Sequence, residues 1–252
     1  MLGLGEAGAR YAADLLAAGL AVTGYDPAGP GARPVPAGLR WAANEAEAVA
    51  GAGVVLSLNA ASTAEQAARN ALPGLRPGTV FADLNTASPG GKRQVAAVID
   101  GSGALFVDVA VLAPVPRAGL RTPLALAGPG RAQLAGFLAP LGVPLEDAGP
   151  CPGAAAGRKL LRSVFMKGLA AVVMESLAIA AKAGQEEWLW EQIVSELTAA
   201  DEALATRLVK GTRQHAKRRL AEMRAADEYA AELGAADPVV RAVVARLKEL
   251  AR

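Results

Sequence analysis

The sequence predicts an α/β chain, in which a doubly wound parallel sheet is followed by an all-α C-terminal domain. Two observations support this prediction. Before residue 150, short apolar segments of strand length alternate with amphipathic segments of helix length. After residue 150, the apolar segments are long and helical, and no further strand pattern follows. We therefore expect a sheet domain over residues 1–150 and a helical domain over residues 151–252.

The elements of the first half alternate along the chain. A helix is expected over residues 9–18, where Gly19 ends it, and the first clear strand is expected over residues 20–26. Further strands, each separated from the next by a helix or loop, are expected at residues 53–59, 79–85, 104–112, 122–128 and 143–147. Apolar strands connected by helices predict a parallel sheet that is covered on both faces and has right-handed crossovers.

The second half consists of helical patterns. Residues 153–183 predict one long helix, and shorter helices are expected over residues 212–233 and 238–251. An apolar stripe near the C-terminus predicts a homodimer formed through the helical domain, because a small domain leaves such a stripe uncovered. Its residues are Val239, Val240, Val243, Val244 and Leu247. The longest apolar run, residues 168–181, is interrupted by Glu175 and is shorter than a bilayer span.

The composition excludes several classes of function. Apolar residues make up 52% of the chain and charged residues 20%, which predicts a packed core. A net charge of +2 is too small to indicate binding to nucleic acid or to an anionic membrane. The single cysteine, Cys151, cannot form an internal disulfide or hold a metal alone, so we expect a structural role for it and no metal site. With no signal-peptide pattern at the N-terminus, a cytoplasmic protein is expected.

The opening residues MLGLGEAG contain a Gly-x-Gly-x-x-Gly pattern formed by Gly3, Gly5 and Gly8. A helix follows directly, and its free N–H groups and dipole can hold a pyrophosphate. Asp26 ends the next strand, where a carboxylate accepts hydrogen bonds from ribose hydroxyls. This context favours a Rossmann-type dinucleotide-binding loop over a structural glycine turn. The expected loop residues are Gly3, Leu4, Gly5, Glu6, Ala7 and Gly8.

The cofactor predicted by this loop is NAD or NADP. The Asp26 carboxylate repels a 2′-phosphate, which favours NAD slightly. Arg33, in the loop that follows, is placed to bind such a phosphate instead. Only Met1 and Leu2 precede the loop, whereas a buried strand normally has about five residues. We therefore expect a start codon assigned too late or a trimmed chain, because the first strand lies in the middle of a doubly wound sheet.

Over nearly its whole length the sequence resembles the β-hydroxyacid dehydrogenase and 6-phosphogluconate dehydrogenase superfamily. The glycine loop and the strand ends Val55–Asn59 and Phe81–Thr86 carry the first part of this resemblance. The segment Gly153–Lys159 resembles the superfamily's helix signature, with Ser163 at its asparagine position. Further matches are Glu175, Gly184 and the tail around His215 and Lys217–Arg219, which resembles a phosphogluconate dehydrogenase-like subgroup with unassigned substrates.

This resemblance implies an NAD(P)-dependent oxidoreductase that transfers a hydride between the nicotinamide and a small hydroxy acid or related alcohol/carbonyl substrate. Lys159 is implied to be the catalytic acid/base. Ser163, Lys167 and His215 are candidates for substrate binding, although a lone histidine or lysine on a helix is commonly just solvated. Polar residues that follow the strands, Asn59 and Thr86, are expected near the nicotinamide, because ligands gather at the carboxyl ends of parallel strands.

Two departures from the superfamily pattern bear on the substrate. Residues 108–114 replace the superfamily's Asp-x-Pro-Val-Ser-Gly-Gly loop, so its Ser-Gly-Gly cradle for a substrate carboxylate is absent. Met166 stands where 6-phosphogluconate dehydrogenases carry a glutamate acid, which disfavours that activity. Two alternatives stay open: an imine reductase-like enzyme on the same scaffold, which Lys159 disfavours, and a non-catalytic dinucleotide-binding or dimeric protein.

Overall fold

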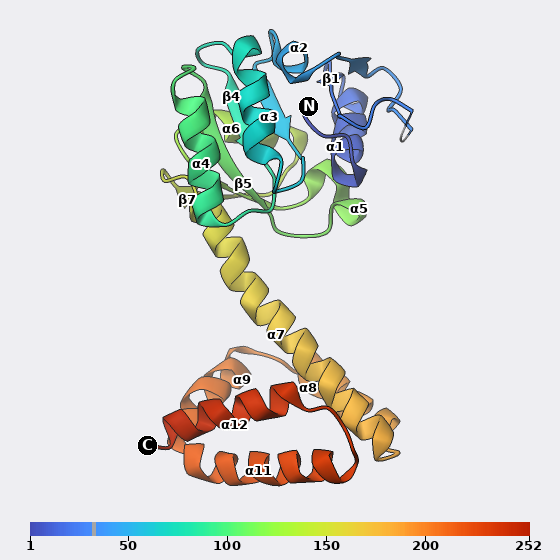
Figure 1. The fold of residues 1–252 in the computed structure, drawn as a ribbon, viewed down its shortest axis with the longest axis vertical. Helices are drawn as coiled ribbons and strands as arrows, with labels where there is room; N and C mark the ends of the chain where they lie inside the picture. Colours follow the sequence, from blue (N-terminus) through green and yellow to red (C-terminus); the bar gives the residue numbers. More distant parts are fainter. Residues whose placement is uncertain (32–33) are drawn as a thin grey trace. The chain divides into compact units, whose positions relative to one another are not determined.

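The structure is a computed structural model that describes residues 1–31 and 34–252 (Figure 1). The chain divides into two compact units, residues 1–162 and 163–252. The helix α7 (Ala154–Lys182) begins in the first unit and continues into the second.

The first unit is an α/β unit whose strands are short. Its helices are α1 (Glu6–Ala17), α2 (Glu45–Val49), α3 (Ala64–Ala71), α4 (Pro89–Asp100), α5 (Val115–Ala118) and α6 (Arg131–Leu138). Its strands are β1 (Thr23–Gly24), β2 (Arg40–Trp41), β3 (Val54–Ser57), β4 (Val80–Asp83), β5 (Leu105–Val111), β6 (Leu124–Ala127) and β7 (Leu145–Gly149). Five strands form one sheet in the order β3-β4-β5-β6-β7, and β1 pairs with β2 in a second sheet.

Leu2 joins the two sheets. It forms parallel bridges to Tyr25, just after β1, and to Ser57 at the end of β3. The Leu2 N–H donates to the Leu56 carbonyl oxygen at 2.9 Å, and its own carbonyl oxygen accepts from the Leu58 N–H at 2.7 Å. The glycine loop is therefore held at the carboxyl ends of the central strands, as the doubly wound fold requires.

The backbone just before the loop is less completely paired. The Met1 amino group donates to the Thr23 carbonyl oxygen at 2.7 Å. Burial lowers the pKa of this amino group to about 5, because a charged amine is poorly solvated there. A cavity of about 400 Å³ adjoins Met1 and is lined mainly by Leu20–Thr23 and Ala50–Val54. The central position in the sheet is thus filled by one fully buried residue, Leu2, next to open space.

The expectation of an entirely parallel sheet is wrong at β6. This strand runs antiparallel to β5, with Asp108 opposite Ala127, while the other pairs in the sheet are parallel. A parallel return needs a crossover that carries the chain back across the sheet. The connecting helix α5 has only four residues, and Asp14 of α1 accepts a hydrogen bond from the Leu120 N–H at 2.8 Å. The connection therefore packs against α1 and supplies no crossover.

Both faces of the five-stranded sheet are covered by helices (Figure 1). Successive residues of each strand belong to different apolar clusters, as the period of two along a strand requires. One cluster contains Leu56, Ala82 and Val107, together with side chains from α1 and α6. The other contains the neighbouring residues Val55, Phe81 and Phe106 and side chains from α2, α3 and α4. This confirms the prediction of a sheet buried on both faces.

The second unit contains the rest of α7 and helices α8 to α12. Their bounds are α8 (Glu186–Thr198), α9 (Glu202–Thr206), α10 (Thr212–Gln214), α11 (Ala216–Glu232) and α12 (Pro238–Leu250). The helix predicted over residues 212–233 is interrupted at His215. Glu175 of α7 caps α12, because its two carboxylate oxygens accept from the N–H groups of Val239 at 2.9 Å and Val240 at 2.8 Å.

The apolar stripe of α12 is less exposed than expected. Leu247 is buried and the four valines are half-buried, and α12 packs against α11. Most of the exposed large apolar side chains lie instead on α7 and α8. They include Leu161, Val164, Phe165, Met174, Trp188 and Trp190.

The length of α7 also corrects an expectation. At 29 residues it is long and apolar enough to cross a membrane by length and composition, although its apolar run was expected to be too short. One such helix is weak evidence for a membrane span. Moreover, the first turn of α7 is hydrogen-bonded to the sheet of the first unit.

Candidate cofactor and active site

The glycine loop connects Leu2 with α1, and two of its glycines are required by the backbone. Gly3 has φ +86°, and a Cβ there would lie 2.4 Å from the Leu58 carbonyl oxygen. A Cβ at Gly8 would lie 2.1 Å from the Gly3 carbonyl oxygen. Gly5 differs, because a Cβ there would meet no atom within 4 Å. Gly5 is also the N-cap of α1, so the open space lies at a helix N-terminus, where an anion is stabilised.

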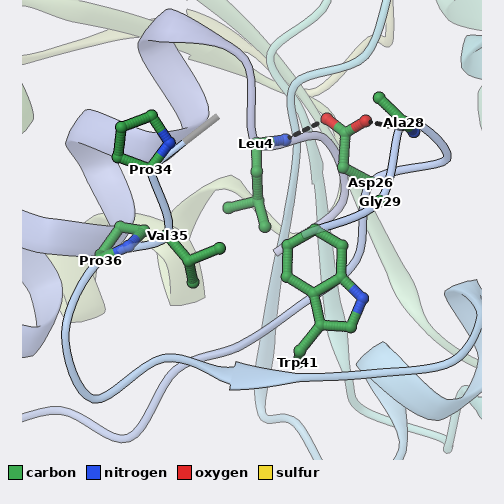
Figure 2. Close-up of a pocket in the computed structure, with 8 residues that line it drawn as sticks. All are labelled: Leu4, Asp26, Ala28, Gly29, Pro34, Val35, Pro36 and Trp41. Atoms are coloured by element: carbon green, nitrogen blue, oxygen red, sulfur yellow. Dashed lines mark hydrogen bonds between the residues drawn. The ribbon is translucent and has the colours of Figure 1, made fainter. Parts of the chain in front are cut away.

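Asp26 is bonded directly to this loop. Its carboxylate accepts from the Leu4 N–H at 2.7 Å and from the Ala28 N–H at 2.9 Å. Figure 2 shows these two bonds at a small pocket formed by the glycine loop, the turn after Asp26 and the segment leading to β2. The lining residues are Leu4, Asp26, Ala28, Gly29, Pro34, Val35, Pro36 and Trp41. Arg33, the expected alternative phosphate ligand, lies outside the described residues.

Polar side chains at and just after the ends of β3 and β4 form a network at the same edge of the sheet. The Ser57 hydroxyl accepts from the side-chain amides of Asn59 at 3.0 Å and Asn85 at 3.2 Å. The Asn85 amide also donates to Asp83 at 2.6 Å. Asn59 adjoins the glycine loop, because its Oδ1 lies 3.0 Å from the position of a Cβ on Gly3. The structure therefore brings Asn59 next to the loop, while Asn85, which like Thr86 follows β4, is buried beneath this edge.

Lys159 reaches the end of β4 from α7. Its Nζ donates to the Thr86 hydroxyl oxygen at 3.0 Å. The two residues are 73 positions apart in sequence, and the lysine is half-buried while Thr86 is exposed. Of the predicted site residues, Lys159 and Thr86 are thus in direct contact at the carboxyl edge of the sheet.

A buried ion cluster that was missed from the sequence holds α7 in place. Lys92 of α4 is 1% exposed and donates to the Asp83 carbonyl oxygen at 2.6 Å. Its Nζ also lies 3.2 Å from the Asp83 carboxylate and 3.5 Å from the Asp108 carboxylate, and both aspartates are completely buried. The other carboxylate oxygen of Asp108, Oδ2, accepts from the N–H groups of Gly153 and Ala156 at the start of α7.

This cluster fixes the position of the first turn of α7, and thereby the position of the Lys159 backbone. Asp108 is paired across the strands with Asp83, and a carboxylate at a helix N-terminus is stabilised by the helix dipole. Gly153 is required there, because its φ is +95° and a Cβ would lie 2.7 Å from the Pro89 carbonyl oxygen. The sequence signal was one aspartate inside each of two otherwise apolar strands. Charges buried in this way need a partner.

Two arginines of α7 contact backbone carbonyl oxygens of the first unit. Arg158 donates to the Asp147 carbonyl oxygen at 2.9 Å, and Arg162 to that of Leu112 at 3.5 Å. The pKa of the Asp147 carboxyl group lies below its ordinary value. The main cause is the hydrogen bond from the Gly149 N–H, and the positive charges of Arg131 and Arg158 lower the pKa further.

The predicted substrate residues Ser163, Lys167 and His215 belong to the second unit. Ser163 is half-buried on α7, while Lys167 and His215 are exposed. His215 occupies the break between α10 and α11. Their roles in substrate binding stay predictions.

Comparison with known families agrees with this geometry. Residues 1–131 match the model of the NAD-binding domain of 6-phosphogluconate dehydrogenase. The chain belongs to this NAD-binding family. Residues 180–250 match a domain of unknown function, DUF1932. The resemblance to the 6-phosphogluconate dehydrogenase superfamily and the Rossmann-type fold followed by helices are confirmed, and NAD or NADP is the cofactor class of the family.

Relatives of this NAD-binding family include named dehydrogenases. A probable 3-hydroxyisobutyrate dehydrogenase of Mycobacterium tuberculosis is 36% identical over 123 residues, which are 48% of this chain and 42% of the relative. The chain spans about half the length of the curated relatives it matches. A conserved hypothetical protein of Sinorhizobium meliloti is 32% identical, with a TM-score of 0.65 over 98% of this chain and 86% of that one.

An imine reductase of Aspergillus terreus, solved with NADPH4 and dibenz[c,e]azepine, has the same fold. Its TM-score is 0.84 over 100% of this chain and 92% of that one, with 19% identity. At this identity the likeness concerns the fold alone.

Proposed function

We propose that the protein is an NAD(P)-dependent oxidoreductase that transfers a hydride between the nicotinamide and a small hydroxy acid or related alcohol/carbonyl substrate. The observation that supports this most is the hydrogen bond from Lys159 Nζ to Thr86 at 3.0 Å. It puts an amine at the carboxyl edge of the sheet, where ligands of doubly wound sheets bind, on the edge that also carries the glycine loop.

The residues of the first unit suit a dinucleotide along this edge. The open space at Gly5 and the N–H groups at the start of α1 would receive the pyrophosphate. The pocket at Asp26 would receive the adenosine ribose, and Asn59 and Thr86 would lie toward the nicotinamide. The Asp26 carboxylate favours NAD over NADP, because a negative charge repels a 2′-phosphate.

In this proposal Lys159 moves the proton of the reaction. A bound nicotinamide supplies the hydride acceptor or donor. In oxidation, a neutral Lys159 amine takes the proton of the substrate hydroxyl as the C–H bond gives up its hydride. In reduction, the Lys159 ammonium group returns a proton to the carbonyl oxygen. Thr86 orients the amine by accepting its hydrogen bond.

Imine reduction is the second candidate, because the same fold is found in an imine reductase. A non-catalytic dinucleotide-binding role is the third. The first two candidate functions are distinguished by measuring two rates: oxidation of hydroxy acids with NAD⁺, and reduction of cyclic imines with NADH or NADPH. Cofactor binding without turnover of either class would support the third.

The cofactor proposal predicts that NADH binds more tightly than NADPH in a fluorescence titration. Asp26→Asn is expected to weaken NADH binding about tenfold, because a charge-assisted hydrogen bond contributes about 1.5–3 kcal/mol. The preference for NADH over NADPH should shrink at the same time. Asp100→Asn, at an exposed aspartate at the end of α4, is the control and should change neither affinity. Unchanged NADH binding in Asp26→Asn would remove Asp26 from the ribose site.

We also propose a homodimer formed through the helical region, in a cytoplasmic protein. The support is the exposed apolar surface of α7 and α8, where Val164 is 75% exposed, Met174 is 72% exposed and Trp188 is 57% exposed. Apolar surface of this extent marks an interaction site. Sedimentation at micromolar concentration should show a dimer that Phe165→Glu converts to monomer, while a wild-type monomer would contradict the proposal.

A further inference from the structure

Two cationic side chains of α7 reach the ends of neighbouring strands. Lys159 and Arg162 are three residues apart, so they lie on the same side of the helix. Lys159 contacts Thr86, three residues after the end of β4, and Arg162 contacts the carbonyl oxygen of Leu112, the first residue after β5. Since β4 and β5 are adjacent and parallel, both cations lie at one edge of the sheet.

Arg162 is poorly satisfied by the protein. Its contact with the Leu112 carbonyl oxygen is long, at 3.5 Å, and no ion pair to Arg162 occurs within residues 1–31 and 34–252. The aspartates of these two strands, Asp83 and Asp108, are already engaged by Lys92 and by the start of α7. Most of the donors of an exposed guanidinium group therefore remain available for a ligand.

The short segment between β5 and α5 has no side chain that could hold an anion. Leu112, Ala113 and Pro114 are all apolar. A substrate carboxylate beside this segment would therefore be bound by a side chain of another element, and α7 brings an arginine there. Arg158 donates to the Asp147 carbonyl oxygen, beyond β6 in the sheet order, which leaves Arg162.

We propose that Arg162 is the specificity-determining residue that binds the carboxylate of a hydroxy acid, so that the site selects anionic substrates. The inference rests on the proposed function and names its substrate class. The planar guanidinium group binds a carboxylate through two parallel hydrogen bonds. Side chains three apart on a helix start about 5–6 Å apart, so one small molecule can present its carboxylate to Arg162 and its hydroxyl to Lys159. A cationic iminium ion would be repelled at this position.

The test compares 3-hydroxypropionate with its neutral amide. With NAD⁺ as co-substrate, Arg162→Gln should raise KM for the acid at least tenfold, change kcat little and leave KM for the amide within twofold. Arg162→Lys should recover part of the affinity for the acid. Arg158→Gln, which removes a neighbouring positive charge, should preserve the ratio of the two KM values. Equal losses for acid and amide, or no loss, would overturn the role of Arg162.

A binding measurement keeps this test independent of turnover. The NADH-bound protein is titrated with 3-hydroxypropionate and with its amide, in the wild type and in Arg162→Gln. Tighter binding of the acid only when Arg162 is present supports the inference. Equal binding of the acid to both proteins, or no binding to the wild type, contradicts it. Wild-type binding without turnover would count against the proposed reaction while supporting the anion site.

Discussion

Lys159→Met is expected to lower turnover by about 10²–10⁴-fold, the usual contribution of a general acid/base. The reason is that methionine retains the length and helix propensity of lysine but cannot accept or donate the reacting proton. The affinity for NADH should change less than twofold, because in this proposal the pyrophosphate and the adenosine ribose are bound by the glycine loop and Asp26, which the substitution leaves unchanged. Steady-state kinetics and a NADH titration of the same preparation measure both quantities.

The control for this substitution is Lys248→Met, at an exposed lysine of α12. It should leave turnover and NADH binding unchanged. Thr86→Val tests the positioning of the amine, and a loss smaller than that of Lys159→Met is expected, since the amine itself remains. Retained turnover in Lys159→Met would exclude Lys159 as the acid/base and would reopen imine reduction, in which the proton donor is another group.

Lys92→Met is expected to destabilise the protein by about 3–5 kcal/mol, the usual cost of removing one partner from a buried ion pair. It leaves the carboxylates of Asp83 and Asp108 completely buried without the cation that lies 3.2 and 3.5 Å from them. The free energy of unfolding from urea titrations measures the effect. For comparison, Lys248→Met removes an exposed lysine and should cost less than about 0.5 kcal/mol.

A double variant makes this prediction specific to charge. Lys92→Met combined with Asp83→Asn removes one of the two uncompensated charges, while an asparagine oxygen can still accept from Asn85. It should therefore be more stable than Lys92→Met alone. If the single variant stayed within about 1 kcal/mol of the wild type, or if the double variant were less stable still, the cluster would not have the energetic role that its burial indicates.

Much of the first unit followed from local pattern. Strand segments predicted at residues 53–59, 79–85 and 104–112 contain β3, β4 and β5, because buried parallel strands are continuous apolar runs. The helix predicted over residues 153–183 matches α7 within one residue at each end. The glycine pattern had a local cause at Gly8, where a Cβ would overlap the Gly3 carbonyl oxygen, whereas Gly3 is required by the Leu58 carbonyl oxygen, which is distant in the chain.

Other features depend on contacts between distant residues. The antiparallel direction of β6 follows from a connection that packs on α1, and a strand's own residues do not record its direction. The break at His215 is equally absent from the helical pattern of residues 212–233, which continues through it. The stripe on α12 was predicted to be exposed because periodicity shows which face is apolar and not what covers it.

The sequence by itself therefore determined the order of helices and strands, the glycine loop with Asp26 and the cofactor class, because each depends on residues close in the chain or on a family pattern. Only the tertiary structure decided that Lys159 meets Thr86, that Arg162 lies at the end of β5 and that Lys92 neutralises Asp83 and Asp108. These pairs join residues up to 73 positions apart. Their distances and burial, and hence their electrostatic strength, exist only once the strands and α7 are packed together.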